Sequence, residues 1–203
     1  MTRKRNACFR VRLATGGAAA LGLAFGVAFT ASAQVDQLKV AEPDPRAQSE
    51  QAFRRMATVL THPRCLNCHT RVDYPKQGDD RHRHQFRVLR GSDDRGAAAM
   101  MCSTCHQPVN NAASGVPGAP NWHLAPLRMA WEDLSVGELC RTIKDTSKNG
   151  ARNIPALVEH LTGDPLVQWA WNPGGNRAPP PIGQSEFHEL VRGWADSGAA
   201  CPK

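Results

Sequence analysis

The sequence has few large apolar residues for its length of 203, and it has no stretch in which apolar and polar residues alternate. The missing alternation argues against β-strands, which show a period of two. The shortage of large apolar side chains limits the hydrophobic core that the chain can build unaided. We therefore expect an all-α fold with long loops, in which something besides the protein's own side chains completes the core.

The sequence also lacks an apolar run long enough for an ordinary membrane span. The run from Ala18 to Phe29 follows a basic start and precedes Ala31-Ser32-Ala33, a small-x-small cleavage sequence. This order is typical of a secretory signal peptide. There is no convincing twin-arginine pair. We expect residues 1–33 to be removed on export to the periplasm; an uncleaved segment would be the chain's only membrane contact.

A basic stripe is missing from the expected mature chain. The signal segment contains five basic residues and no acidic ones, so its removal lowers the formal net charge from +7 to +2. Nucleic-acid binding is therefore not expected.

Against these absences, one pentapeptide pattern, Cys-x-x-Cys-His, occurs twice. "CLNCH" spans residues 65–69 (the first motif) and "CSTCH" spans 102–106 (the second motif). The pattern is typical of covalent haem attachment, in which two cysteine sulfurs bond the vinyl groups and the histidine binds the iron. We expect Cys65 and Cys68 to attach one haem c with His69 as its iron ligand. Cys102 and Cys105 would attach a second, with His106 as its ligand.

Zinc binding is the main alternative, because the four cysteines could form one tetrahedral site. Zinc does not explain why a histidine follows both pairs. A thioredoxin-like dithiol is less favoured, since no βαβ pattern surrounds either motif.

Two cysteines of the mature chain remain, Cys140 and Cys201. In an oxidising compartment we expect them to form a disulfide that ties the C-terminus to an earlier helix. Two free buried thiols are the alternative.

Residues 34–46 are predicted to be a flexible lead and residues 47–203 one compact domain with two haems, because the motifs start too close together for two separate cytochrome units. A helix is expected from the cap Asp44 to Pro63, with an apolar stripe of Phe53, Met56, Ala57 and Leu60. Others are expected from a Ser135–Glu138 capping box to Asn149-Gly150 and over about Pro155–Leu161. Another begins at Asp164-Pro165, and a last one runs from a Ser185 cap to Gly198. We expect "GAAAMM" (96–101) to be a short helix, with loops at 70–95, 107–128 and 172–183.

The chain resembles small exported bacterial dihaem c-type cytochromes, and more narrowly the group labelled isoquinoline 1-oxidoreductase subunit. The similar stretches cover nearly all of the chain after residue 50: "HPRCLNCH", "MCSTCHQPVNN", "PGAPNWHLAPLRMAW", "LCRTIKD", "HLTGDPLVQWAWNPGGNRAPPP" and "GAACP". The resemblance implies electron transfer from a partner dehydrogenase, for which a molybdenum hydroxylase is a candidate. The chain itself shows no molybdopterin or iron–sulfur signature.

Each iron has a sixth coordination position, and the sequence offers several side chains for it. For the first haem we favour His84 over His82, because it is closer to the apolar "FRVL" stretch. For the second haem His160 and Met129 are equal candidates, and each could instead be an ordinary core residue. His62, His123 and His188 are weaker. Arg128, Arg177 and Arg192 could pair with haem propionates, although solvated surface is the favoured interpretation for each, and the five tryptophans are expected to pack around the haems.

The expected function is periplasmic electron transfer between partner proteins. The alternative is a haem enzyme of the dihaem peroxidase type, which needs one iron with an open distal site. Whether the protein is an enzyme therefore depends on how the sixth positions are filled.

Overall fold

The computed structural model describes residues 44–203. The expected signal peptide (1–33) and most of the expected lead (34–46) lie outside the described residues. Helices dominate residues 44–203, with a few short strands between the two motifs, so the all-α expectation is correct in outline. No helix in this part of the chain is long and apolar enough to cross a membrane.

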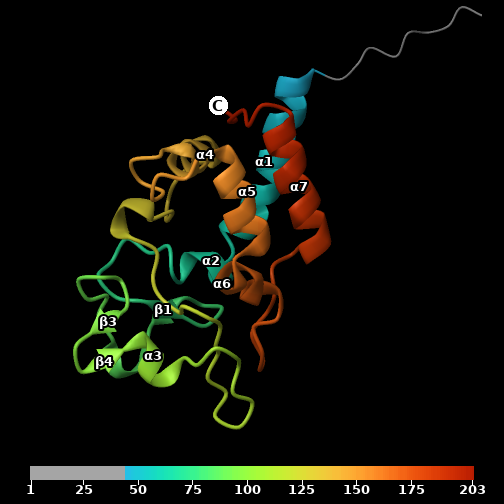
Figure 1. The fold of residues 1–203 in the computed structure, drawn as a ribbon. Coiled ribbons are helices and arrows are strands. Elements are labelled where there is room, and N and C mark those ends of the chain that lie inside the picture. Colours follow the sequence, from blue (N-terminus) through green and yellow to red (C-terminus); the bar gives the residue numbers. More distant parts are fainter. Residues whose placement is uncertain (1–43) are drawn as a thin grey trace, which may run out of the picture. The chain divides into compact units, whose positions relative to one another are not determined.

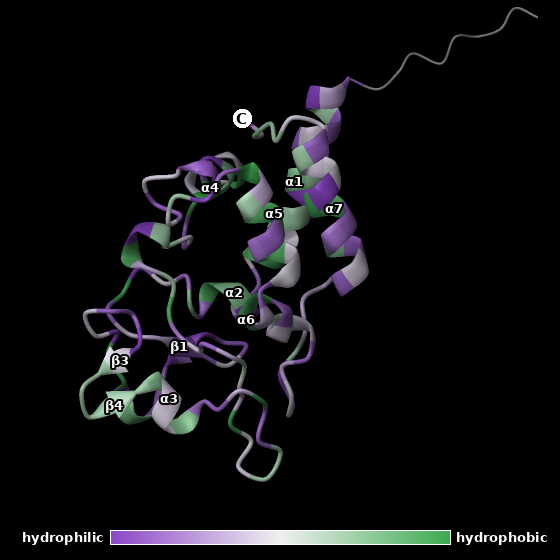
Figure 2. Cartoon of the chain, viewed as in Figure 1, coloured by the Kyte–Doolittle hydropathy of each residue, from purple (hydrophilic) through white to green (hydrophobic). Residues whose placement is uncertain are grey.

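The first and last helices form one packed pair (Figure 1). Helix α1 (Pro45–Leu60) begins as predicted, with the Asp44 carboxylate accepting the Arg46 N–H and proline in the first turn. Its predicted apolar stripe is buried against α7 (Gln184–Asp196), where the rings of Phe53 and Trp194 lie 5.6 Å apart. In Figure 2 both helices mix polar and apolar residues along their length, as helices with one buried face do.

The start of α7 differs from the prediction. Gly183 occupies the N-cap position without a side-chain hydrogen bond, and Ser185 lies inside the first turn. The predicted end is correct, because the helix stops at Asp196 and Gly198 then adopts a positive φ of 100°.

Three further helices precede α7 in the sequence: α4 (Val136–Lys144), α5 (Ile154–Gly163) and α6 (Pro165–Gln168). The 3-10 turn η3 (Trp169–Trp171) follows α6 directly. The predicted capping box of Ser135 and Glu138 is present. Helix α4 ends at Lys144, earlier than expected. The Asp145 carboxylate accepts the backbone N–H and hydroxyl of Ser147, a local turn that competes with the helix.

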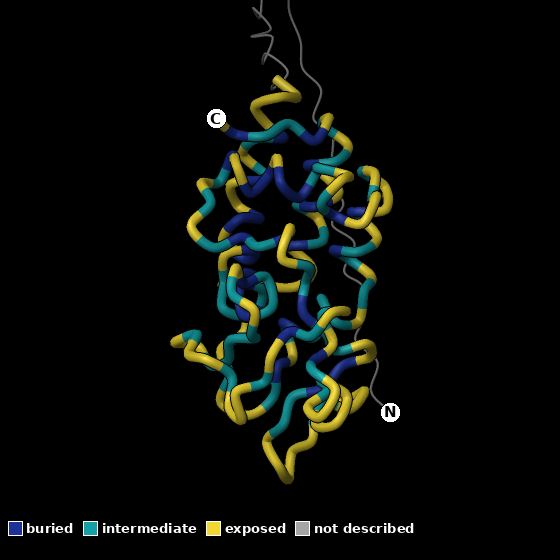
Figure 3. The backbone as a smooth tube through the Cα atoms, turned by 90° about the vertical axis from the view of Figure 1, so that its left-hand side faces the viewer, coloured by how far each residue is buried: buried dark blue, intermediate teal, exposed yellow. Residues whose placement is uncertain are grey.

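The predicted disulfide is present between Cys140 of α4 and Cys201, with Cα atoms 5.5 Å apart. It fixes the end of the chain on the core formed by α1, α4, α5 and α7, where most buried residues lie (Figure 3).

The motif-bearing region consists of short elements and loops. Helices α2 (Pro63–Leu66) and α3 (Cys102–Cys105) carry the motifs, and the 3-10 turns η1 (Gln85–Arg87) and η2 (Leu127–Met129) interrupt the loops. Two small antiparallel hairpins pair β1 (Lys76–Gln77) with β2 (His82–Arg83) and β3 (Gly96–Ala97) with β4 (Met100–Met101).

The helix predicted for residues 96–101 is therefore wrong, as is the expectation that strands are absent. Gly96 has a φ of 101°, outside the helical range, and the backbone N–H of Cys102 bonds the carbonyl of Arg95. Six residues are too few for a helix to persist without tertiary support, even when alanine-rich.

A buried carboxylate anchors the loop that follows the first motif. The Glu132 side chain is 6% exposed and pairs with Lys76 and Arg81. It also accepts hydrogen bonds from the Thr70 hydroxyl and the Arg71 N–H. These bonds fix the loop of residues 70–81 to the segment that contains Trp131 and Glu132.

Candidate haem-binding site

Both motifs adopt the same local structure, one turn of helix. In the first, the His69 N–H bonds the Cys65 carbonyl at 3.0 Å. In the second, the His106 N–H bonds the Cys102 carbonyl at 2.9 Å. Cysteines three apart on such a turn lie on one side of it. Each motif therefore presents two thiols together, with a histidine directly after them.

The two motif histidines are held in the same way. The Nδ1 atom of His69 lies 2.7 Å from the Met129 carbonyl oxygen, and that of His106 lies 2.8 Å from the Pro117 carbonyl oxygen. A carbonyl oxygen only accepts, so in both rings Nδ1 carries the hydrogen. Nε2 then keeps its lone pair, the arrangement found in metal-binding histidines.

Burial keeps both imidazoles neutral. It lowers the pKa of His69 to about 3, and it also lowers the pKa of His106. Neither ring is protonated at neutral pH, so each can act as a ligand without first losing a proton.

Each motif histidine also lies flat against an indole. The rings of His69 and Trp131 are stacked with centroids 3.3 Å apart, and those of His106 and Trp122 with centroids 4.4 Å apart. Trp169 meets Trp122 edge to face at 4.8 Å. These stacks fix the ring planes and place aromatic surface beside both motifs, as expected for three of the five tryptophans.

The motif cysteines remain unpaired, unlike Cys140 and Cys201. Burial raises the pKa of Cys65 to about 12 and of Cys68 to about 11, and it also raises the pKa of Cys102. Zinc needs thiolates gathered around one point. Within residues 44–203, no three or more Cys, His, Asp or Glu side chains gather in that way. A haem iron takes four ligands from its porphyrin, so this finding does not count against haem.

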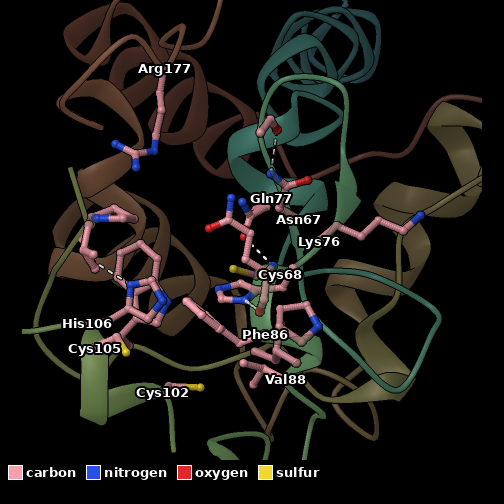
Figure 4. A pocket seen from close by; sticks show the side chains of 18 of the residues that line it. Asn67, Cys68, Lys76, Gln77, Phe86, Val88, Cys102, Cys105, His106 and Arg177 are labelled. Atoms are coloured by element: carbon pink, nitrogen blue, oxygen red, sulfur yellow. Dashed lines mark hydrogen bonds between the residues drawn. The ribbon is translucent and has the colours of Figure 1, made fainter. Parts of the chain in front are cut away.

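Two adjacent cavities adjoin the motifs. The larger, about 510 Å³, is lined by the second motif's Cys102, Cys105 and His106 (Figure 4). The smaller, about 180 Å³, is lined by the first motif's Cys65, Cys68 and His69. The cavities share the following wall residues: Arg64, Cys68, Trp122, His123 and Trp169.

The donor sets of both cavities fit a haem, and the size of the larger also fits. Cofactor sites occupy about 300–1,000 Å³, a range that includes the larger cavity and exceeds the smaller one. A haem at the first motif therefore requires the smaller cavity to widen.

The candidates for the sixth positions are exchanged relative to the prediction. His84 lines the larger cavity, and its ring centroid lies 5.8 Å from that of His106. His160 and Met129 line the smaller cavity, beside His69. The structure thus places His84 beside His106 and places His160 and Met129 beside His69, the reverse of the predicted pairing, because residues of loop 70–95 line the larger cavity and α5 lines the smaller one.

The structure favours His160 over Met129 beside the first motif. The Met129 carbonyl is bonded to Nδ1 of His69, and the Met129 side chain belongs to the core cluster. The Nδ1 of His160 lies 3.0 Å from an Asp164 carboxylate oxygen, which leaves Nε2 unengaged. In the same way, the Nδ1 of His84 lies 2.7 Å from the Gln85 carbonyl oxygen.

The other histidines are held differently. His62 accepts the Arg64 N–H at Nδ1, which places its hydrogen on Nε2, and the Nε2 of His188 is bonded to Gln168. His82 is exposed and pairs with Asp80. His82 also lines the larger cavity, and His123 bonds the Asn121 carbonyl through Nδ1 and lines both cavities, so these two remain rivals to His84 and His160.

Of the predicted propionate partners, Arg177 lines the larger cavity, whereas Arg128 and Arg192 are exposed and line neither. Arg64 was missed, although it stands directly before Cys65 and a basic residue beside the attachment site was a usable signal. The carbonyls of Met129 and Pro117 could not be found from sequence, because every residue has one.

Comparison with known proteins found no family model, no curated protein and no solved structure that matches this chain.

Proposed function

We propose that this chain is an exported electron-transfer protein that carries two covalent haems c, one on each motif. The observation that supports this most strongly is the repeated arrangement around the motifs. In each, two thiols share one helical turn and the next residue is a neutral histidine with Nδ1 bonded to a backbone carbonyl. Each arrangement borders a cavity, and the two cavities share a wall.

Covalent attachment requires no oxidant. Each thiol adds its sulfur to one vinyl carbon and its hydrogen to the other, which forms one thioether. Cys65 and Cys68 would hold the first haem, and Cys102 and Cys105 the second. His69 and His106 would then bind iron through Nε2.

The bound haems would supply one-electron exchange between ferric and ferrous iron. The protein's part is to fill both axial positions, which favours electron transfer over reaction with peroxide. In this proposal His84 and His106 would hold one iron, and His160 and His69 would hold the other. Nitrogen–metal bonds are about 2 Å long, so two imidazoles on one metal ion have centroids roughly 6 Å apart. The 5.8 Å between His84 and His106 is close to that value.

The partners belong to the proposal as well. The resemblance noted above favours a dehydrogenase, such as a molybdenum hydroxylase, as the electron donor, and the periplasm as the compartment. The shared cavity wall, which includes Trp122 and Trp169, would keep the two haems close enough for an electron to pass between them.

Mass spectrometry of the denatured, exported protein tests the proposal. We expect the mature polypeptide plus two haems. C102A/C105A should retain one haem, and C140S/C201S, which removes the same number of cysteines elsewhere, should retain two. A polypeptide without haem would overturn the proposal.

Carbon monoxide separates a carrier from the peroxidase-type enzyme. With both sixth positions filled by side chains, the reduced protein should bind little carbon monoxide. Ready binding to one haem of the wild-type protein would favour the enzyme instead.

A further inference from the structure

Arg64 is a buried cation at the wall common to both cavities. Its side chain is 2% exposed, whereas that of its ion-pair partner Asp79 is 48% exposed. Burying a guanidinium is costly unless its charge and its N–H groups are satisfied. A half-exposed carboxylate on one side satisfies only part of this requirement.

The hydrogen bonding of Arg64 is incomplete in the described part of the chain. Nη2 pairs with Asp79, but the buried Nε has no partner there. Arg90 is as deeply buried, and its Nε is also unpaired. Its terminal nitrogens, however, bond Asp94 and the carbonyls of Ala125, Thr70 and Val72. Protein groups thus bind both terminal nitrogens of Arg90, whereas Asp79 is the only partner of the Arg64 guanidinium in this part of the chain.

The charge around the larger cavity is also unbalanced. Arg177 lines it and donates only to the backbone carbonyls of Pro173, Gly174 and Gly115 (Figure 4). Burial lowers the pKa of Arg64; Asp79 raises it, and the field of Arg177 lowers it further. Lys76, the other cation of the lining, is paired with Glu132. Apart from the Lys76–Glu132 pair, the lining therefore holds two guanidiniums, Arg64 and Arg177, and one carboxylate, Asp79, so its charge would accept another anionic group.

We propose that Arg64 binds a haem propionate carboxylate at the wall between the two cavities and so influences the reduction potentials of both haems. This inference rests on the proposed function. An arginine suits the role because its planar fork of N–H groups matches a carboxylate, which a lysine does not.

The sign of the effect follows from charge. The ferric state has one more positive charge than the ferrous state, so a nearby guanidinium disfavours it and raises the potential. Removing Arg64 lowers the potential, both through loss of that charge and because the propionate loses its counter-charge. Removing the Asp79 carboxylate has the opposite effect.

Redox titration of the holoprotein, followed by its absorption spectrum, tests the inference. We expect R64Q to lower both potentials, D79N to raise them, and R177Q to lower mainly that of the second-motif haem. R55Q is the matched control, because Arg55 pairs with exposed Glu186 away from both cavities, and it should shift neither potential.

The outcomes separate the alternatives. If Arg64 only holds Asp79 in place, R64Q and D79N will shift the potentials in the same direction, or not at all, and the inference is wrong. If R64Q does not fold or does not bind both haems, D79N and the charge-preserving R64K provide the test. The reduction potentials of R64K are expected to lie between those of the wild type and those of a variant without the charge. The haem count of each variant is measured first, so a protein without haem would refute the proposed function, not this inference alone.

Discussion

The imidazole rings of His84 and His106 lie 5.8 Å apart with their planes at 68°, although 21 residues of loop, hairpin and helix separate them in sequence. Both rings have Nδ1 bonded to a backbone carbonyl, so both offer Nε2. This pair gives the sharpest test of how the second haem is coordinated.

H84A should open the sixth position of the second haem. About half of the total haem is then expected to become high spin and, once reduced, to bind carbon monoxide. H188Q is the control, because the Nε2 of His188 is already bonded to Gln168 and His188 lines neither cavity. Equal effects of the two variants, or no effect of H84A, would exclude His84 as the ligand.

The first haem is tested by H160A and M129L. We expect H160A to produce a high-spin haem, because its Nε2 is unengaged and it lines the cavity with His69. M129L should leave the spin state unchanged, because the backbone carbonyl that holds His69 is retained. It should lower the free energy of unfolding by less than about 1.5 kcal/mol, since leucine has a similar volume. A high-spin haem in M129L but not in H160A would make the thioether the ligand. If neither changes it, H123A becomes the decisive variant.

Glu132 should make the protein sensitive to acid. Burial favours its protonated form, but hydrogen bonds from Lys76, the Arg71 N–H and Thr70 outweigh this and lower the pKa of Glu132 to about 2, from an ordinary 4.5. A carboxyl whose pKa is depressed by folding stabilises the folded state above its unfolded pKa. That contribution is lost as the pH falls from about 4.5 to about 2.

E132Q should therefore lower the free energy of unfolding at neutral pH by roughly 2–3 kcal/mol, because it leaves Lys76 and Arg81 without their counter-charge. It should also flatten the dependence of stability on pH below 4.5. Urea unfolding of the holoprotein at several pH values measures both effects. D133N, which breaks the exposed pair with Arg71, should cost less than about 1 kcal/mol. An equal cost for both variants would contradict the role of the buried network.

The C140S/C201S variant should be less stable than wild type by roughly 4 kcal/mol, because the bridge joins residues 61 apart and restricts the unfolded chain. Haem content and potentials should be unchanged, since neither cysteine lines a cavity. Thermal unfolding with and without a reductant measures the effect. An unchanged melting temperature would show that the disulfide contributes nothing.

Local patterns in the sequence predicted most of the helices. Three helix starts were predicted in this way: the Asp44 cap, the Ser135–Glu138 capping box and the Asp164-Pro165 start. Each depends on residues within one helical turn of each other, so it can be predicted without knowledge of the fold. The same holds for the motifs, whose spacing already places two thiols and a histidine together. The Cys140–Cys201 bridge followed from the number of cysteines left over.

Predictions that depended on competing local structures were less accurate. The "GAAAMM" segment has helix-favouring residues, but it is too short for their helix propensity to prevail. It forms a hairpin instead, in which Gly96 pairs with Met101 and Ala97 pairs with Met100. Helix α4 ends at Lys144 because the Asp145 carboxylate accepts the backbone N–H of Ser147. The periodicity of apolar residues does not indicate this local turn.

Only the tertiary structure decided which histidine lies beside which motif. Sequence proximity suggested that His84 would fold back over the first motif, yet hairpin β1–β2 and the Glu132 anchor direct its loop over the second. His160 reaches the first motif because α5 packs on α7 and because Leu157 and Leu161 of α5 join the same core cluster as Phe53 and Leu60 of α1. The sequence alone determined the spacing of two thiols and a histidine on which the proposed attachment depends, because that spacing resides in five consecutive residues. The partners opposite each motif depend on long-range packing, which local spacing does not encode.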